Sequence, residues 1–160
     1  MNKSKNSLKN KIKVYIGSDH AGFPMKEGIL ASKELCSFIE FVDVGTYSMD
    51  SVDYPDFAQK IGESVLKNPS SYGIGICGTG IGIAIALNKM NGIYAANVVN
   101  QNGASLAKRH NDVNVITLSG RFISIEENIK IVYEFFTQNF EKGRHINRLN
   151  KIKKMEEHDV

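Results

Sequence analysis

Short apolar runs alternate with longer stretches of helical spacing along most of this chain, and this alternation limits its fold more than any other feature. The apolar runs predict five strands, at residues 14–16, 41–44, 74–77, 93–96 and 115–118. Short strands separated by helices form βαβ units, in which helices cover both faces of a parallel sheet. The sequence therefore predicts an α/β fold of three layers, α/β/α, with a five-stranded parallel, Rossmann-like sheet.

Six helices are predicted between and after these strands. They cover residues 23–38, 55–66, 83–89, 103–109, 125–140 and 145–156. Pro55 suits the first turn of its helix, and Pro69 follows the end of the same helix. The last helix is a C-terminal addition to the sheet. Residues 1–11 are polar and predict a disordered leader, which leaves residues 12–160 as a single domain of ordinary size.

The composition argues against membrane and secreted proteins. No apolar run approaches the ~20 residues that a transmembrane helix needs, and the first residues lead into no apolar signal-peptide core. The two cysteines, Cys36 and Cys77, are too few for a disulfide framework and have no zinc-site spacing. We therefore expect a cytoplasmic protein that has no membrane partner.

The net charge of +3 is unevenly distributed along the chain. Residues 1–11 carry four lysines and no acid, and residues 142–154 carry six basic side chains and no acid, whereas residues 12–141 have a net charge of −4. A nucleic-acid binder more often clusters its cations across a folded face, with aromatic side chains between them. The charge pattern therefore argues against a nucleic-acid partner.

Chemically distinctive side chains follow the predicted strands. Asp19 and His20 come after the first strand, Tyr54 after the second, and Arg121 after the fifth, while Cys77 ends the third. Open parallel sheets bind their ligands at the carboxyl ends of the strands, which share one edge. These side chains are therefore expected to meet in a binding site at that edge.

The third predicted strand leads into a glycine-rich turn, Gly-Thr-Gly-Ile-Gly at residues 78–82. The turn is not a P-loop, because Ile81 stands where the lysine belongs. It is not a dinucleotide fingerprint either, because Ile83 replaces the last glycine and Asn97 replaces the acidic residue expected after the next strand. Backbone N–H groups at such a turn can hold a phosphate or a developing oxyanion. Cys77 at its start favours the second use.

Each candidate also has a plain structural alternative. The glycines can serve only a tight turn, Cys77 can be a buried packing residue, and Asp19 can cap the helix that follows it. A lone histidine is more often structural than catalytic, and Arg144 and Arg148 can be solvated charges on one helical face. These alternatives weaken together because many of the candidates fall on one predicted edge.

Several motifs follow one another in a fixed order. They are Gly-Ser-Asp-His-Ala-Gly at 17–22, Asp-Tyr-Pro at 53–55, Ile-Cys-Gly-Thr-Gly-Ile-Gly at 76–82, Asn-Lys at 88–89, Arg-His-Asn-Asp at 109–112, Gly-Arg at 120–121 and Gly-Arg-His at 143–145. At this spacing they resemble type B ribose-5-phosphate isomerase, a family that includes galactose-6-phosphate isomerase subunits. The resemblance runs from about residue 13 to about residue 157. It implies an aldose–ketose isomerase of sugar phosphates that uses no metal or organic cofactor.

The same resemblance implies a role for each matching residue. Cys77 would move a proton between C2 and C1 through a cis-enediolate, Thr79 would assist at the sugar oxygens, and Asp19 and His110 would open the furanose ring. Substrate binding would fall to His20, Tyr54, Gly78, Gly80, Ile81, Gly82, Asn111, Arg121, Arg144 and Arg148. Among these, residues 78–82 and Asn111 would form the anion hole, Tyr54 would line the sugar pocket, and His20 and the arginines would hold the phosphate.

The resemblance also implies a homodimer, or a tetramer, with active sites shared between subunits. His110 and Asn111 precede the fifth strand and so lie away from the predicted site edge, which a role in the neighbouring subunit's pocket would explain. The expected substrate is ribose 5-phosphate, converted to ribulose 5-phosphate in the non-oxidative pentose phosphate pathway. Two alternatives stay open: a six-carbon substrate such as galactose 6-phosphate or allose 6-phosphate, and a non-catalytic phosphate-binding module.

Overall fold

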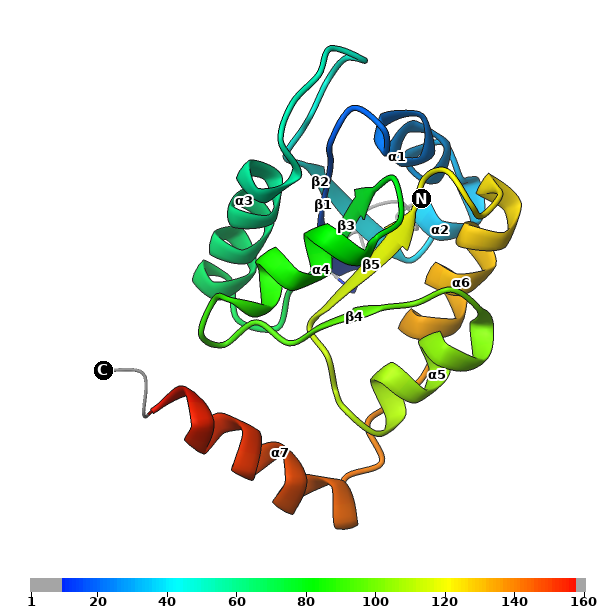
Figure 1. Ribbon diagram of the computed structural model, residues 1–160. Coiled ribbons are helices and arrows are strands. Elements are labelled where there is room, and N and C mark those ends of the chain that lie inside the picture. Colours follow the sequence, from blue (N-terminus) through cyan, green and yellow to red (C-terminus); the bar gives the residue numbers. More distant parts are fainter. Residues whose placement is uncertain (1–9, 158–160) are drawn as a thin grey trace.

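The computed structural model describes residues 10–157, and its centre is a five-stranded sheet (Figure 1). Neighbouring strands are parallel throughout and follow the order β2-β1-β3-β5-β4. The strands are β1 Ile12–Ser18, β2 Ile39–Asp43, β3 Tyr72–Cys77, β4 Ala95–Asn97 and β5 Val115–Ser119. The predicted α/β fold with a five-stranded parallel sheet is confirmed.

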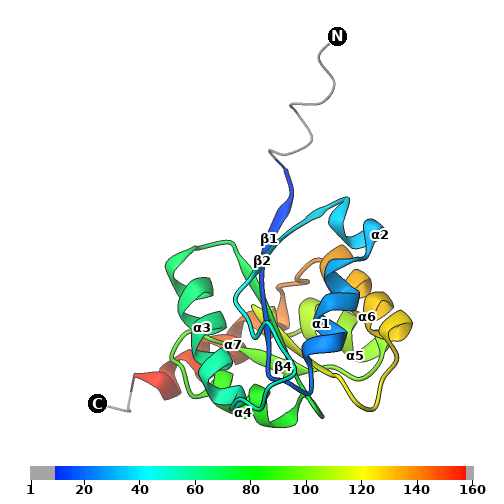
Figure 2. The same ribbon diagram turned by 90° about the horizontal axis from the view of Figure 1, so that it is seen from above.

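Helices cover both faces of this sheet. They are α1 Phe23–Leu30, α2 Lys33–Cys36, α3 Tyr54–Lys67, α4 Ile81–Asn88, α5 Gln101–Arg109, α6 Ile125–Thr137 and α7 Arg144–Glu156. Helices α1, α2, α5 and α6 lie on one face, and α3 and α4 lie on the other (Figure 2). Together with the sheet they form the three predicted layers, and α7 is the predicted C-terminal helix.

The strands contribute side chains to a separate core on each face. In β1, Val14 and Ile16 pack in the core beneath α1 and α6, whereas Tyr15 packs in the core beneath α3 and α4. Cys77 at the end of β3 belongs to this second core. Both faces of the central strands are therefore buried, which explains why their sequences are nearly continuous apolar runs.

The strand order has a reversal that fixes where a ligand can bind. After β1 the chain forms β2 on one side, and it then returns past β1 to form β3 on the other side. A reversal of this kind is the topological switch point of an open sheet, and ligands bind there at the carboxyl ends of the strands. Asp19 and His20 follow β1 at this point, and Cys77 ends β3 beside it.

Two predicted elements differ from the structure for reasons that its contacts show, and the bounds of the other elements shift by at most three residues at either end. The helix expected over residues 23–38 is two helices, because the Ser32 side chain accepts a hydrogen bond from the Leu35 N–H at 3.3 Å and caps α2. The strand expected at 93–96 begins later, at β4 Ala95–Asn97. There, Ile93 and Tyr94 donate their N–H groups to the Met90 carbonyl and the Asn114 side chain instead of a neighbouring strand. Most of the predicted leader, residues 1–9, lies outside the described residues.

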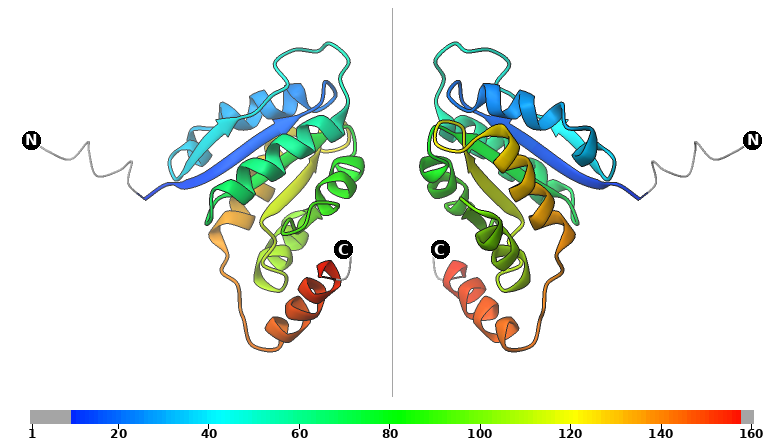
Figure 3. Two further views of the ribbon diagram at one scale, coloured as in Figure 1. Left: turned by 90° about the vertical axis from the view of Figure 1, so that its left-hand side faces the viewer. Right: turned by 90° about the vertical axis from the view of Figure 1, so that its right-hand side faces the viewer.

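Helix α7 extends away from the three layers (Figure 3). Its side chains are mostly exposed, and the exposed ones include Ile146, Ile152 and Met155. A helix that exposes apolar side chains in a single chain is a candidate contact surface. Across residues 10–157, none of the helices has the length and apolar character needed to cross a membrane.

Candidate active site

The loops that follow β1, β3 and β5 are pressed against one another. A Cβ atom added at Gly22, after β1, would lie 2.6 Å from the Ile76 carbonyl oxygen of β3. One added at Gly120, after β5, would lie 2.8 Å from the Ala21 carbonyl oxygen. Only glycine allows such close approach of backbone to backbone. The three loops therefore form one continuous surface at the carboxyl edge of the sheet, as predicted.

The glycine-rich turn directs a backbone N–H group at the Cys77 sulfur. Gly80 has φ +81°, a left-handed conformation that favours glycine, and it is the N-cap residue of α4. From this position its N–H donates to Cys77 Sγ at 3.2 Å, and the Thr79 hydroxyl oxygen accepts the Ile81 N–H at 3.1 Å. An N–H donor and the positive end of a helix both stabilise negative charge on sulfur. Cys77 itself is 4% exposed in the single chain.

Two hydroxyl groups of β5 hold the carbonyl side of the same turn. Thr117 Oγ1 donates to the Gly80 carbonyl and Ser119 Oγ donates to the Gly78 carbonyl, both at 2.8 Å. With these carbonyls bound on one side, the orientation of the turn's N–H groups is fixed. Sequence reasoning missed both residues. The available signal was two hydroxyl side chains two positions apart in a strand, which places them on the same face.

Asp19 and His20 are both tied into the loop that follows β1. Asp19 Oδ1 accepts the Gly22 N–H at 2.9 Å and so holds the turn before α1. Gly22 is the N-cap residue of α1 and no side chain caps this helix, so Asp19 does not serve as the helix cap that the structural alternative supposed. His20 Nδ1 lies 3.2 Å from both the N and the O of Val52, in the loop between β2 and α3. These contacts hold both side chains beside the switch point.

Tyr54 and Arg121 lie directly against the glycine-rich turn. A Cβ added at Gly82 would lie 2.6 Å from the Tyr54 ring, and one added at Gly78 would lie 3.1 Å from the Arg121 guanidinium. The Arg121 N–H also donates to the Gly78 carbonyl. The structure therefore brings together a thiol, an amide-lined turn, a phenol and one guanidinium, which is suited to binding an anionic, hydroxylated ligand.

The structure does not bring the remaining predicted residues to this turn. His110 and Asn111 lie at the end of α5, and Arg144 and Arg148 belong to α7, which Figure 1 shows well away from the loop between β3 and α4. His110 instead stacks on His145, with ring centroids 4.3 Å apart. A single chain therefore contains the predicted site in two separate parts.

In the part of the site that contains His110, neighbouring groups shift two pKa values. Around His110, burial lowers the pKa of His145, and the neighbouring His110 and Arg144 act in the same direction while Glu141 opposes them. A hydrogen bond from Arg109 lowers the pKa of the Glu141 carboxyl. Both shifts favour a neutral imidazole facing an ionised carboxylate at neutral pH.

The chain matches a known family over almost all of its described length. A family model described as Ribose/Galactose Isomerase matches residues 14–152. The chain belongs to this family. Probable ribose-5-phosphate isomerase B of Mycoplasma pneumoniae is 46% identical over 140 residues, which cover 87% of this chain and 91% of the relative. Ribose-5-phosphate isomerase B of Escherichia coli is 37% identical over 145 residues, which cover 91% and 97%.

A solved structure of the Ribose/Galactose Isomerase family has the same fold. Ribose-5-phosphate isomerase B from Mycoplasma genitalium, determined with bound ribulose-5-phosphate, superposes with a TM-score of 0.85 at 43% identity. The match covers 92% of this chain and 97% of that chain. The family resemblance predicted from the motifs is therefore confirmed.

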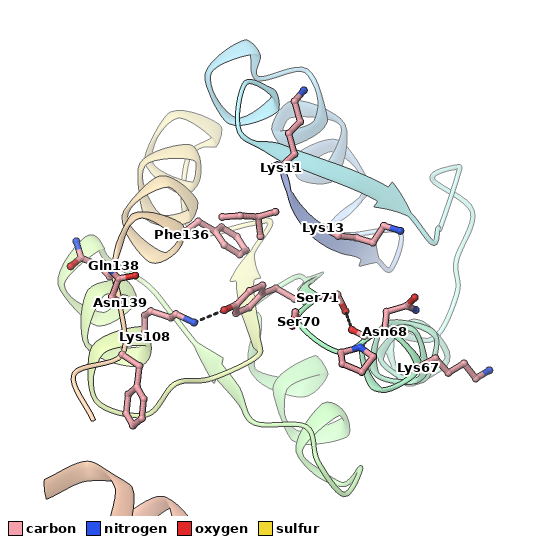
Figure 4. A pocket seen from close by; sticks show the side chains of 14 residues that line it. Lys11, Lys13, Lys67, Asn68, Ser70, Ser71, Lys108, Phe136, Gln138 and Asn139 are labelled. Carbon is pink, nitrogen blue, oxygen red and sulfur yellow. Dashed lines mark hydrogen bonds between the residues drawn. The ribbon is translucent and has the colours of Figure 1, made fainter. Parts of the chain in front are cut away.

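The present chain also has a cavity of about 660 Å³ away from the candidate site, at the amino ends of β1 and β3 (Figure 4). Lys11, Lys13, Lys67 and Lys108 are among its lining residues, and the Lys108 ammonium donates to the Tyr72 hydroxyl at 2.6 Å. None of the predicted catalytic or substrate-binding residues lines it. This cavity therefore lies at the edge of the sheet opposite the predicted site.

Proposed function

We propose that this protein is a cytoplasmic isomerase that interconverts D-ribose 5-phosphate and D-ribulose 5-phosphate. The observation that carries the proposal is the hydrogen bond from the Gly80 N–H to Cys77 Sγ at the start of the glycine-rich turn. The carbonyls of that turn accept hydrogen bonds from the hydroxyl groups of β5. Family membership supports it, as do the names of the relatives and the ribulose-5-phosphate bound in the Mycoplasma genitalium structure. No cofactor is required by the chemistry proposed below.

Isomerisation starts with the open-chain aldose and Cys77 as thiolate. The sulfur takes the proton from C2, the electron pair of that C–H bond forms the C1=C2 bond, and the C1 oxygen takes the negative charge of a cis-enediolate. The thiol then returns the proton to C1. The C2 oxygen becomes the carbonyl, and its former hydroxyl proton passes to the C1 oxygen with the help of Thr79. Backbone N–H groups of residues 78–82 stabilise the negative charge of the enediolate. Loss of one such donor typically raises the activation free energy by about 2.7–4 kcal/mol.

Ring opening and phosphate binding use the remaining residues of the site. Asp19 and His110 act as the proton acceptor and donor that open the furanose ring, and Tyr54 lines the sugar pocket. His20, Arg121, Arg144 and Arg148 hold the phosphate, because planar guanidinium groups can make two hydrogen bonds to it at once. Asn111 completes the anion hole.

A homodimer with shared sites, or a tetramer built from such dimers, reconciles these roles with the geometry. His110, Asn111, Arg144 and Arg148 lie far from Cys77 within one chain, so they act in the pocket of a partner chain. Helix α4 offers a surface for the contact, because Ile81 and Ile85 are 54% and 58% exposed next to the glycine-rich turn. Exposed apolar side chains on α7 offer a second contact surface.

Replacing the proposed base gives the direct test. Cys77→Ala is expected to lower kcat by about 10²–10⁴-fold, because a general base supplies about this factor, while substrate binding and the fold are retained. Turnover is measured with ribose 5-phosphate in the presence of a chelator. Cys36→Ala is the matched control, since Cys36 ends α2 and its Sγ donates to the Leu30 carbonyl at 3.4 Å, outside the candidate site. Retention of more than about a tenth of the wild-type turnover by Cys77→Ala would contradict the role of a general base.

The phosphate clamp predicts a different kinetic signature. Arg144→Ala is expected to raise KM with little change in kcat, because a phosphate contact that is equal in ground state and transition state contributes only binding. Steady-state kinetics with ribose 5-phosphate separate the two parameters. A fall in kcat at unchanged KM would show that Arg144 does not serve as a clamp.

A six-carbon sugar phosphate is the second candidate substrate. The family description names galactose as well as ribose. In the galactose pathway two different subunits share the site residues, whereas this chain carries a full set, which favours the pentose. Comparing kcat/KM for ribose 5-phosphate, galactose 6-phosphate and allose 6-phosphate decides between them. A non-catalytic phosphate-binding module would turn over none of the three and would be indifferent to alkylation of Cys77.

A further inference from the structure

Three side chains that commonly bind transition metals lie together where α5 ends and α7 begins. Their ligand atoms, one each from His110, Glu141 and His145, all lie within 4.8 Å of one another. Glu141 Oε2 lies 3.6 Å from the Nε2 atom of each histidine. The proposed isomerisation uses only His110 from this cluster, so the presence of the other two side chains calls for an explanation.

His145 carries a buried nitrogen that has no hydrogen-bond partner. Its side chain is 6% exposed, and Nε2 is inaccessible to water and makes no hydrogen bond to the described residues. Buried polar atoms are nearly always satisfied, and the exceptions often mark a ligand or ion position. The orphaned Nε2 faces Glu141 Oε2 across a gap that is too long for a hydrogen bond.

Glu141 is held in place by contacts that leave one carboxylate oxygen available. Arg109 binds Oε1 through Nε at 2.8 Å and Nη2 at 2.6 Å, and the Glu141 N–H donates to the Arg109 carbonyl at 2.9 Å. The other oxygen, Oε2, is directed at the two imidazoles. Outer contacts that fix the orientation of a ligand in this way are typical of metal sites.

We propose that His110, Glu141 and His145 form a binding site for a divalent transition metal of the zinc class. Two imidazole nitrogens and one carboxylate oxygen are a common zinc ligand set, which leaves a fourth position open. Ligand atoms about 2.0–2.1 Å from a tetrahedral ion are about 3.3–3.4 Å apart, close to the two separations of 3.6 Å. The imidazole ligands argue against magnesium and calcium.

The His110 side chain must change its orientation when a metal ion binds. The two rings are stacked with an interplanar angle of 19°, so the more exposed His110 ring must rotate to point its Nε2 at a shared ion. Arg109 neutralises part of the Glu141 charge, and Arg144 lies on the adjacent helix. We therefore expect moderate, reversible binding, weaker than at a closed structural site with cysteine ligands.

Metal binding at this site would regulate the isomerase, an inference that rests on the proposed function. A bound ion occupies the His110 nitrogen and prevents it from opening the furanose ring in the partner's pocket. The metal is an inhibitor and takes no part in isomerisation, so the reaction itself remains independent of metals.

Cobalt provides a direct probe of the site. Co²⁺ is titrated into the chelator-treated, desalted full-length protein, and the intense visible band of four-coordinate Co²⁺ is followed until Zn²⁺ displaces it. We expect one ion per chain. His145→Gln and Glu141→Gln should each weaken Co²⁺ binding at least tenfold. Two control variants should bind Co²⁺ as the wild type does: Cys77→Ser, which removes the thiol at the glycine-rich turn, and Glu63→Gln on α3. Glu141→Gln remains informative if the buried His145 variant fails to fold.

The possible outcomes distinguish a failure of the proposed metal site from a failure of the proposed isomerase function. A band lost in Glu141→Gln, together with Zn²⁺ inhibition that is at least tenfold weaker in that variant, supports both the site and its effect. The absence of a band in the wild type, or a band unchanged in both cluster variants, overturns the metal site and leaves the proposed isomerase intact. A band without inhibition supports the metal site and contradicts the ring-opening role proposed for His110.

Discussion

Lys26 is a completely buried lysine that joins α1 to the loop after β2. Its ammonium donates to Asp43 Oδ1 and to the Thr46 carbonyl, each at 2.6 Å, and lies 4.9 Å from the centre of the Tyr47 ring. Lysine is rarely buried without such partners. The same loop carries Val52, whose backbone contacts His20, so this ion pair also supports the site.

Removing the Lys26 charge is therefore expected to destabilise the fold. Lys26→Met leaves Asp43 and a carbonyl group without their donor, and we expect a loss of about 3 kcal/mol, at the low end for a broken buried pair because Asp43 is partly exposed. Urea unfolding measures this change. Lys33→Met, an exposed lysine of α2, should shift stability by less than about 0.5 kcal/mol. Equal midpoints for the two variants would show that the buried pair contributes nothing.

The residue scale also shows what a sequence can and cannot predict. Cys77 and the glycine-rich turn were found because their chemistry is local in the chain. Lys26, Thr117 and Ser119 were missed, because their importance comes from partners 17 to 41 positions away, which the sequence alone does not reveal.

At the scale of elements, β5 and α4 act together on the glycine-rich turn. The hydroxyl groups of Thr117 and Ser119 in β5 donate to the carbonyls of Gly80 and Gly78, and Gly80 is the N-cap residue of α4. Strand β5 therefore supports the amide groups that are proposed to face the enediolate. We therefore expect stability and catalysis to depend on the same contacts.

Thr117→Val tests this dependence, because it removes one hydroxyl and keeps the shape of the side chain. The buried Gly80 carbonyl loses its donor, which should destabilise the protein by about 1–3 kcal/mol. We also expect kcat to fall by about ten- to a hundredfold, less than the loss of a whole oxyanion donor, with a smaller change in KM. Thr137→Val is the matched control, since that exposed hydroxyl donates to the Tyr133 carbonyl on the surface of α6. Unchanged kcat in a destabilised Thr117→Val would limit β5 to a structural role.

Element order was predictable, whereas some element boundaries were not. The alternation of strands and helices follows from hydrophobic periodicity, which is a property of short segments. The break between α1 and α2 depends on one Ser32 hydroxyl competing for a backbone N–H. The late start of β4 depends on the side chain of Asn114, 20 positions from Tyr94. The hydrophobic periodicity of the sequence predicts neither of these two hydrogen bonds.

At the scale of the whole molecule, the candidate site is divided between two regions of one chain. Cys77, Tyr54 and Arg121 surround the glycine-rich turn, whereas His110 and Arg144 lie by α7. The sequence predicted both sets from family motifs, and the family resemblance implied a partner chain for His110, whose place before β5 lies away from the predicted site edge. A two-fold symmetric dimer is the simplest assembly that reunites the sets, because one contact then completes two sites.

Mixing two inactive variants tests this assembly. Cys77→Ser and His110→Ala should each be nearly inactive alone. After subunit exchange, about half of the dimers are mixed, and each mixed dimer has one site with both wild-type residues, so activity should return to about a quarter of the wild-type value. Mixing Cys77→Ser with Cys77→Ala is the control and should restore nothing. If each site draws both residues from one chain, every site of a mixed dimer keeps a defect, and the absence of recovery despite proven subunit exchange would rule out the shared site.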